Sequence, residues 1–357
     1  MSGIHKDRTD QFTAKIDHRI NDRQNLNVYY YLSDSTLFDP YSRFQAGGAT
    51  VLDFGANTAE RYQQWNLAHN WTITNNIVNE ARFNYFRESQ GTFLHPQNTN
   101  LVQNSCATVS PDACFNDGTP GNPTGIHPGL GASREGVPFI SVSGGFNIGN
   151  NFEGEIPQTG NSFQWSDNLS WVKGTHTMKF GGDVRRQRFD QLLYYNVNGL
   201  YSYYGGGNND VGYSNDLIPN YLLGLPDTFS QGSAQSENIR STIFSLFAQD
   251  SWKIRPNLTL NYGLRWELFT PLTDVSGHVQ SFRPGQTSTK YPCTFTLPEN
   301  CPVGLQVPGD PGVPAGLTST YYKTFAPRLG IAYSPGTSGK TSIRAGWGML
   351  YVPTVML

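Results

Sequence analysis

The chain has 357 residues and a formal net charge of −2, and only 15% of its residues are charged, so its charge gives no reason to expect a nucleic-acid partner. It is rich in glycine (38), phenylalanine (21) and tyrosine (19), a composition that suits strands and turns better than helices. No apolar run reaches about 18 residues, which excludes an ordinary transmembrane helix but not strands, because strands that cross a membrane alternate and dilute their own hydropathy.

Five pairs of alternating segments follow one another along the chain. In the first, at residues 11–33, apolar Phe12, Ala14 and Ile16 alternate with polar neighbours, and a turn follows at residues 21–23. A period of two places alternate side chains on opposite faces of a strand. We therefore predict five β-hairpins, or about ten strands, at residues 11–33, 62–87, 161–189, 240–269 and 324–351.

The hairpin at residues 240–269 has the clearest pattern. Its second arm alternates Leu264 and Trp266 with the charged Arg265 and Glu267. An apolar face that ends in tryptophan, with a charged opposite face, is typical of strands that cross a membrane as part of a β-barrel.

The connections between the predicted strands alternate in length. Short turns within the hairpins alternate with loops of dozens of residues, at 88–160, 190–238 and 270–323. A soluble sandwich gives little reason for such alternation, whereas outer-membrane barrels have short periplasmic turns and long extracellular loops. We predict an all-β fold, an antiparallel up-and-down transmembrane β-barrel segment with its long loops outside the cell.

The tryptophans give an independent indication of the membrane. Trp71, Trp171 and Trp252 each lie within about three residues of a short turn, as a periplasmic aromatic girdle requires. Trp266 lies some nine residues beyond its turn, which corresponds to about 23 Å at a strand tilt near 40°. We assign these four residues to the aromatic girdle. Asp167 contradicts the pattern, since it has the phase of the apolar face, and we expect a bulge or a local change of phase there.

The opposite faces of the strands carry charged side chains that we predict to face the lumen. They could form a ligand path, but a hydrated wall held by cross-strand ion pairs is the interpretation we favour. These charges are Glu80, Arg82, Asp183, Arg185, Arg265, Glu267, Arg328 and Arg344.

Tyrosines in the second long loop are better candidates for ligand contact, because loops carry recognition and a tyrosine offers both a stacking face and a hydroxyl group. Carbohydrate or peptide would suit them, and the sequence does not choose between the two. The candidates are Tyr194, Tyr195, Tyr201, Tyr203 and Tyr204.

The four cysteines form two pairs, Cys106 with Cys114 and Cys293 with Cys301, and each pair encloses seven residues of loop sequence. This spacing predicts two local disulfides in an oxidising compartment. Metal binding is the alternative, but no histidine or paired C-x-x-C lies nearby.

We predict neither an enzyme nor a cofactor. The stretch at residues 338–341, SGKT, imitates the end of a P-loop, but a strand pattern follows it where a helix should begin. The histidines show no metal-ligand spacing, and no nucleophile elbow of a hydrolase appears.

The quoted segments also resemble a known family. FAQDSWKIRPNLTLNYGLRWE, at residues 247–267, resembles the barrel hairpin of TonB-dependent outer-membrane receptors. Residues 165–186, 220–231 and 325–351 resemble the large subgroup of this family that often carries a carboxypeptidase-regulatory-like domain and occurs in acidobacteria. The resemblance implies a 22-stranded barrel, a plug domain inside it, and import of scarce ligands with energy delivered by TonB.

Compared with that family, the sequence has no recognisable plug, TonB box, signal peptide or closing terminal strand. We expect a partial barrel, residues 1–357, in the outer membrane of a Gram-negative cell. Its expected partners are outer-membrane lipid, the missing plug and remaining strands, TonB only through that plug, and an unknown small ligand. The alternative is a secreted all-β binding or structural protein with a sandwich core.

Overall fold

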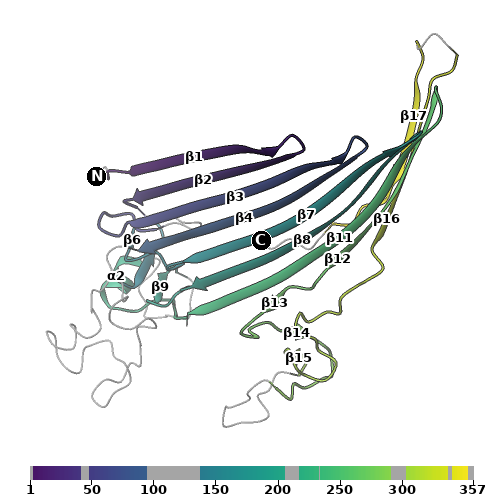
Figure 1. Cartoon of the computed structure of the whole chain (residues 1–357). Helices are drawn as coiled ribbons and strands as arrows, with labels where there is room; N and C mark the ends of the chain where they lie inside the picture. The colour runs from purple at the N-terminus through teal and green to yellow at the C-terminus, as the bar shows by residue number, and fades with distance from the viewer. Residues whose placement is uncertain are drawn as a thin grey trace.

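A computed structural model describes residues 3–41, 48–94, 137–205, 217–232, 234–290, 303–336 and 340–352. Ten of the eleven strands of the large sheet form one continuous path, in which every strand is antiparallel to its neighbours, as predicted (Figure 1). In order across the sheet, the strands are β1 (Lys6–Asn21), β2 (Gln24–Asp39), β3 (Ala56–Thr74), β4 (Ile77–Leu94), β7 (Gln158–Lys173), β8 (His176–Leu193), β11 (Gln235–Arg255), β12 (Leu258–Phe269), β16 (Phe325–Tyr333) and β17 (Ile343–Gly348).

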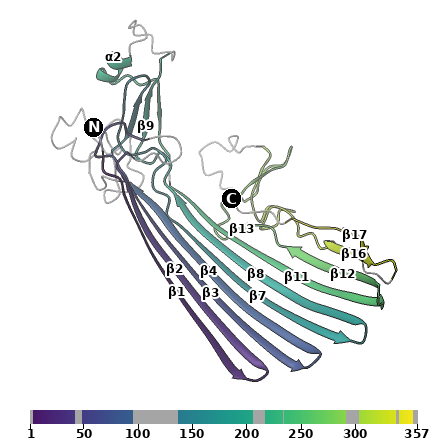
Figure 2. The same ribbon diagram turned by 90° about the horizontal axis from the view of Figure 1, so that it is seen from above.

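The sheet curls but does not close on itself (Figure 2). In the described part of the chain, β1 pairs only with β2 and β17 pairs only with β16, so both are edge strands. The short turns lie together at one end of the sheet and the long connections at the other (Figures 1 and 2). This is the arrangement of an up-and-down barrel wall.

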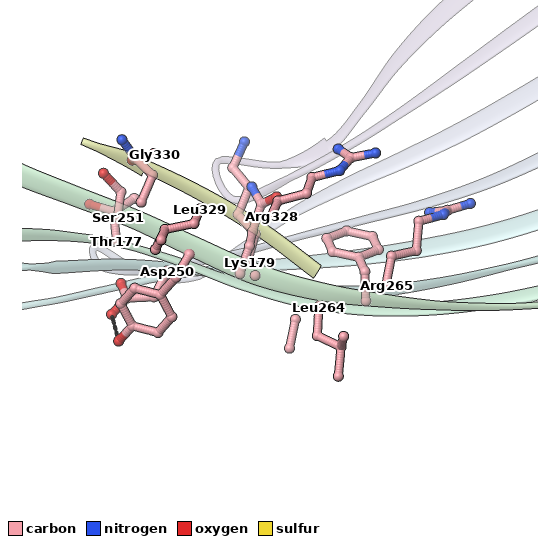
Figure 3. Close-up of a pocket in the computed structure, with 15 residues that line it drawn as sticks. Thr177, Lys179, Asp250, Ser251, Leu264, Arg265, Arg328, Leu329 and Gly330 are labelled. Carbon is pink, nitrogen blue, oxygen red and sulfur yellow. Dashed lines mark hydrogen bonds between the residues drawn. The ribbon is translucent and has the colours of Figure 1, made fainter. Parts of the chain in front are cut away.

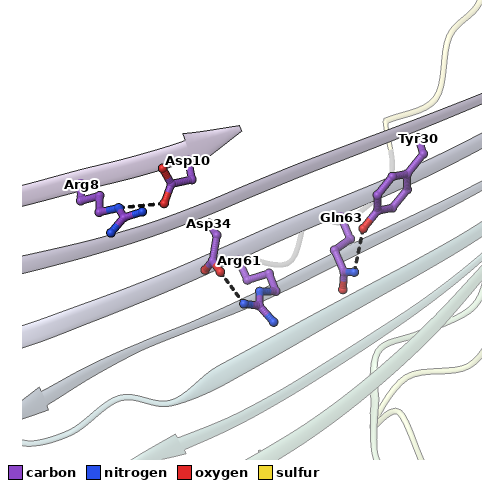
Figure 4. Close-up of polar contacts among 6 residues, drawn as sticks. All are labelled: Arg8, Asp10, Tyr30, Asp34, Arg61 and Gln63. Carbon is purple, nitrogen blue, oxygen red and sulfur yellow. Dashed lines mark hydrogen bonds and ion pairs between the residues drawn. The ribbon is translucent and has the colours of Figure 1, made fainter. Parts of the chain in front are cut away.

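Most of the strands extend well beyond the apolar alternation. The first hairpin, predicted at residues 11–33, covers residues 6–39 in the structure. Its outer part is mostly polar, and pairs such as Arg8 with Asp10 (2.8 Å) and Arg61 with Asp34 cover the ladder there (Figure 4). Backbone pairing thus continues beyond the residues whose hydrophobic alternation predicts the strand.

The long connections contain smaller elements. β5 (Phe139–Val142), β6 (Asn147–Ile148), β9 (Leu200–Tyr203) and β10 (Thr228–Ser230) form a four-stranded sheet in the order β10-β9-β5-β6, with α2 (Leu217–Leu222) beside it. β5 and β9 pair in parallel, and so join the connection after β4 to the connection after β8. We call this unit the loop sheet.

The third connection adds three short strands. β13 (Thr273–Asp274) pairs with β11, and β14 (Ser281–Phe282) pairs with β15 (Leu305–Gln306). No helix among the described residues is both long enough and apolar enough to span a bilayer.

The large sheet is a single layer, and its apolar side chains are exposed. Trp165 keeps 47% of its surface exposed and Leu246 keeps 59%, and many other large apolar residues of the same strands are exposed as well. A sandwich core would need a second sheet over this face, and the described residues place none there. The structure therefore favours the barrel wall over the sandwich alternative.

Candidate functional site

Cross-strand register separates the two faces of the large sheet. The face that carries Leu264 and Trp266 is called the apolar face, and the face that carries Arg265 and Glu267 is called the inner face. Figure 3 shows Arg265, Arg328 and Lys179 on the side towards which the sheet curls, with Leu264 on the opposite side. Register partners link all eight charges predicted for the lumen on the inner face: Glu80, Arg82, Asp183, Arg185, Arg265, Glu267, Arg328 and Arg344.

Several of these charges are neutralised on the inner face itself. Arg82 pairs with Glu80 and Arg265 pairs with Glu267, each at 2.5 Å and each along a single strand, two residues apart. Asp183 accepts a hydrogen bond from Gln164 at 2.6 Å. Four of the eight charges thus form ion pairs on the face itself, and Asp183 is bonded to a neutral amide.

A hollow of 530 Å³ lies on this wall between β8, β11, β12 and β16 (Figure 3). Two glycines line its floor, because Gly263 and Gly330 put no side chain into the space. Lys179, Arg265 and Arg328 line it as well. Register explains why they meet, since Gly263 pairs with Arg328 on one side and with Gln249, the partner of Lys179, on the other.

The hollow has an excess of positive charge. Arg265 is held by Glu267 and donates to the hydroxyl of Ser245 at 2.9 Å. Within the described ranges, neither Lys179 nor Arg328 has a carboxylate within ion-pair distance. Two unneutralised cations over a glycine floor favour an anionic group. The sequence placed Arg328 on the inner face, but no signal in it indicates that Arg328 has no carboxylate partner.

The predicted ligand-contact tyrosines fall into two groups, those that pack within the loop sheet and those that lie at its surface. Tyr203 is only 5% exposed and packs edge-on against Tyr221, with ring centroids 5.7 Å apart. Tyr201 packs against Phe229 at 4.7 Å, and burial raises the pKa of its hydroxyl to about 12. Both therefore stabilise the loop sheet.

The other tyrosines lie at its surface. Tyr204 is 53% exposed, and its backbone N–H donates to Asp227 at 2.7 Å, which fixes its position. Tyr195 is also exposed and packs edge-on against Phe152. Tyr194 is partly exposed. Tyr195 and Tyr204 offer the most accessible rings of the set.

The aromatic side chains of the apolar face lie in two bands. Near the short turns, Trp252 stacks on His176, and Lys173 lies 5.2 Å from the ring centroid of Trp171. Trp71 is exposed on β3, next to its turn. Further along the strands, the indole N–H of Trp266 donates to the carbonyl of Tyr322 at 2.8 Å.

A second aromatic cluster lies on the long-loop side and was not assigned to the predicted girdle. Its ring pairs are Tyr30 with Trp65 at 4.4 Å, Tyr85 with Phe163 at 4.8 Å, and Phe83 with Trp165 at 5.5 Å. We call it the upper aromatic cluster.

The expected bulge at Asp167 is wrong. Register runs without a shift through Asp167 on both of its neighbours, so the carboxylate stays on the apolar face. The free-energy cost of this carboxylate on the apolar face is reduced because Asn79 donates a hydrogen bond to it at 2.8 Å. Asp250 also has polar neighbours, since His176 lies 2.6 Å from its Oδ2 and the hydroxyl of Tyr262 donates to the same oxygen at 2.8 Å. Polar groups on this face thus occur with polar neighbours.

The four cysteines lie outside the described residues, so the predicted disulfides Cys106–Cys114 and Cys293–Cys301 stay predictions. Among the residues that are described, no group of three or more His, Cys, Asp or Glu side chains could hold a metal ion.

Comparisons with solved structures find outer-membrane transporters at low identity. The chain is similar to the outer membrane transporter YddB from Escherichia coli (TM-score 0.47, 10% identity, 96% of this chain and 32% of that chain). It is also similar to the ferripyoverdine receptor of the outer membrane of Pseudomonas aeruginosa (0.47, 11%, 96% and 35%) and to the copper transporter OprC (0.45, 9%, 96% and 37%). The chain spans about a third of each.

Among curated proteins, no sequence matches the chain significantly. A family model described as an outer membrane beta barrel domain matches residues 2–356. With this match over nearly its whole length, and with ten strands in up-and-down order, the chain belongs to the outer membrane beta barrel domain family and is located in the outer membrane.

Proposed function

We propose that this chain forms part of the barrel wall of a TonB-dependent outer-membrane transporter that binds and imports a scarce ligand. The observation that carries the proposal is the contrast between the two faces of one curled sheet, an aromatic, lipid-compatible face and a charged inner face. In this proposal, energy would reach the transporter through TonB and a plug domain. In this proposal the chain binds and conducts without catalysing a reaction.

The cationic hollow at Lys179 and Arg328 supports a role for the inner face in holding a partner. A plug domain that fills the barrel needs contacts with the wall, and an acidic group of the plug would neutralise these two cations. In this proposal, such a contact would hold the plug at one point of the wall and leave the rest of the inner face open to the ligand.

The exposed rings of Tyr195 and Tyr204 support ligand capture at the long-loop end. A tyrosine ring stacks on the apolar face of a sugar or on a peptide side chain, and its hydroxyl adds a hydrogen bond. We therefore propose carbohydrate or peptide as the ligand class, with these two residues in contact with it.

Uptake of labelled oligosaccharides and oligopeptides tests this proposal. Cells that produce the complete protein containing this chain should accumulate one of the two classes, and an uncoupler or deletion of TonB should stop the accumulation. Tyr195→Ala and Tyr204→Ala should each weaken ligand binding to these cells by about 2- to 12-fold, since an aromatic contact contributes about 0.5–1.5 kcal/mol.

Tyr195→Phe and Tyr204→Phe are the matched controls, because they keep the ring and should keep most of the binding. Accumulation that continues without TonB or a proton-motive force would mark a passive channel and contradict the proposal. Ligand binding that survives both alanine substitutions would move the contact away from these tyrosines.

A further inference from the structure

Three arginines stand on the apolar face of the sheet, where charged side chains are unexpected. Arg87 on β4 has the phase of Phe83 and Tyr85, and Arg186 and Arg188 on β8 have the phase of Phe180 and Val184. In strands, this phase points all of them to the same side as the exposed apolar residues. We call Arg87, Arg186 and Arg188 the arginine patch.

Register places the patch directly beside the upper aromatic cluster. Tyr85 pairs with Phe163, which pairs with Arg186. The next row towards the long loops contains Arg87, Asn161 and Arg188. Aromatic bands on barrels lie at the level of the lipid headgroups. The guanidinium groups therefore lie at headgroup depth, on the leaflet next to the long loops.

The partners of the three arginines in the structure are neutral. Arg87 donates to Asn161 at 3.1 Å, Arg186 donates to the hydroxyl of Thr242 at 2.7 Å, and Arg188 lies 5.7 Å from the ring centroid of Phe163. In the part of the chain that the structure describes, none of them has a carboxylate within ion-pair distance.

Neighbouring arginines on the same face differ from the patch in this respect. Arg61 pairs with Asp34, Arg8 with Asp10, and Arg240 with Asp190. Arg188 also stands directly opposite Arg240 in the ladder, and like charges in register destabilise a sheet. Among the described residues, the three positive charges of the patch thus have no ion-pair partner, and an external anion would offset the repulsion between them.

We propose that the arginine patch binds the phosphate groups of an anionic lipid in the outer leaflet. A guanidinium group matches a phosphate with two parallel N–H donors, and it is less strongly hydrated than an ammonium group. The upper aromatic cluster, beside and below the patch, lies where the headgroup of the same lipid meets its acyl chains. The inference concerns the outside of the wall and does not depend on which ligand passes through the barrel.

Native mass spectrometry of the complete protein in a neutral detergent tests the proposal with two probes, diphosphorylated lipid A and the same lipid after its phosphates are removed. The intact protein should retain the phosphorylated lipid and not the dephosphorylated one. The R87Q/R186Q/R188Q variant should bind lipid A at least about tenfold more weakly, because it loses the charged hydrogen bonds between guanidinium and phosphate groups.

The R8Q/R19Q/R61Q variant is the matched control, since it removes three arginines that each pair with a carboxylate in the structure. It should bind lipid A as the unaltered protein does, and circular dichroism should show both variants folded. Equal loss in both variants would reduce the effect to net charge and overturn the proposal. Equal binding of the two lipid forms, or full competition by inorganic phosphate at the concentration of the lipid, would also overturn it.

Discussion

Asp310 organises the third long connection around a single carboxylate. It is only 3% exposed and accepts hydrogen bonds from the backbone N–H groups of Thr289 (2.7 Å) and Val307 (2.9 Å) and from the hydroxyl of Ser288 (2.6 Å). Burial alone would raise the pKa of this carboxyl, but the hydrogen bonds outweigh it and hold its pKa well below the usual range. The charged form therefore stabilises the connection.

We predict that Asp310→Asn loosens residues 281–290 and 303–312. The amide keeps the shape of the carboxylate but replaces one acceptor with a donor, so at least one backbone N–H loses its partner. Hydrogen exchange in these segments should become about tenfold faster or more, as expected when a hydrogen bond to a charged group is lost. Unchanged exchange rates would show that the carboxylate does not hold the connection.

The same carboxylate predicts a pH dependence. Because its pKa is lower in the folded loop than the ordinary value of 3.8 for an aspartate, the unfolded loop binds more protons at acid pH. Protection should be complete above about pH 5 and should fall as the pH drops below 3.8 towards the folded pKa. Hydrogen exchange measures this protection, once the intrinsic effect of pH on exchange is corrected with an unstructured reference peptide. Asp310→Asn should abolish the pH dependence.

Among the strands, β8 packs tightly against both of its neighbours at Gly181. A methyl group there would lie 2.5 Å from the side-chain oxygen of Asn168, 2.6 Å from the ring of Phe247 and 2.7 Å from a backbone oxygen. The missing side chain thus lets Phe247 on β11 lie over β8 on the inner face. By contrast, a methyl group at Gly330 on β16 would meet nothing closer than 3.6 Å.

Gly181→Ala is therefore expected to lower the free energy of unfolding by about 1–3 kcal/mol, the usual cost of overpacking. Gly330→Ala is the control and should change it by less than about 0.5 kcal/mol. Urea titration of the complete protein in micelles measures both. Equal effects of the two substitutions would contradict the close packing at Gly181.

At this scale the sequence predicts what depends on one strand alone. The alternation that ends at Trp266 identifies β12 and both of its faces, because a period of two holds whatever the neighbours are. It does not identify strand ends such as the one at Arg8, where water meets both faces. It also does not reveal that Tyr203 is buried, since the parallel pairing of β5 and β9 that buries it joins two separate loops.

For the candidate site, too, the sequence predicts the face on which a residue lies but not the residues beside it. The face of Arg328 follows from its own strand, but its lack of a carboxylate partner follows from the residues that β12 and β17 place beside it. The patch at Arg87 and Arg188 likewise depends on register across three strands. Neighbour relations of this kind arise in the assembled sheet and leave no local signal.

For the whole molecule, the assignment of the two faces predicts that introducing an arginine destabilises the protein on the apolar face but has little effect on the inner face. Leu264→Arg places a charge on the apolar face and should lower the free energy of unfolding by about 2–4 kcal/mol, the cost near the bilayer midplane. Asn261→Arg, on the inner face of the same strand, should change it by less than about 1 kcal/mol, because that face is hydrated.

Unfolding of the complete protein in lipid vesicles measures both substitutions. The same experiment in the absence of lipid or detergent gives a further check, since the protein should not remain folded there. A larger penalty at Asn261 than at Leu264 would reverse the assignment of the faces.

The strict neighbour order of the ten strands also has a kinetic consequence. Each of the first four hairpins closes through a tight turn of a few residues, so it can form within microseconds and independently of the others. Joining the hairpins then requires closure of long connections, whose entropic cost rises only slowly with length. The parallel pairing of β5 and β9 needs β4, β7 and β8 side by side first, so we expect the loop sheet to be the last part of the long-loop rim to assemble.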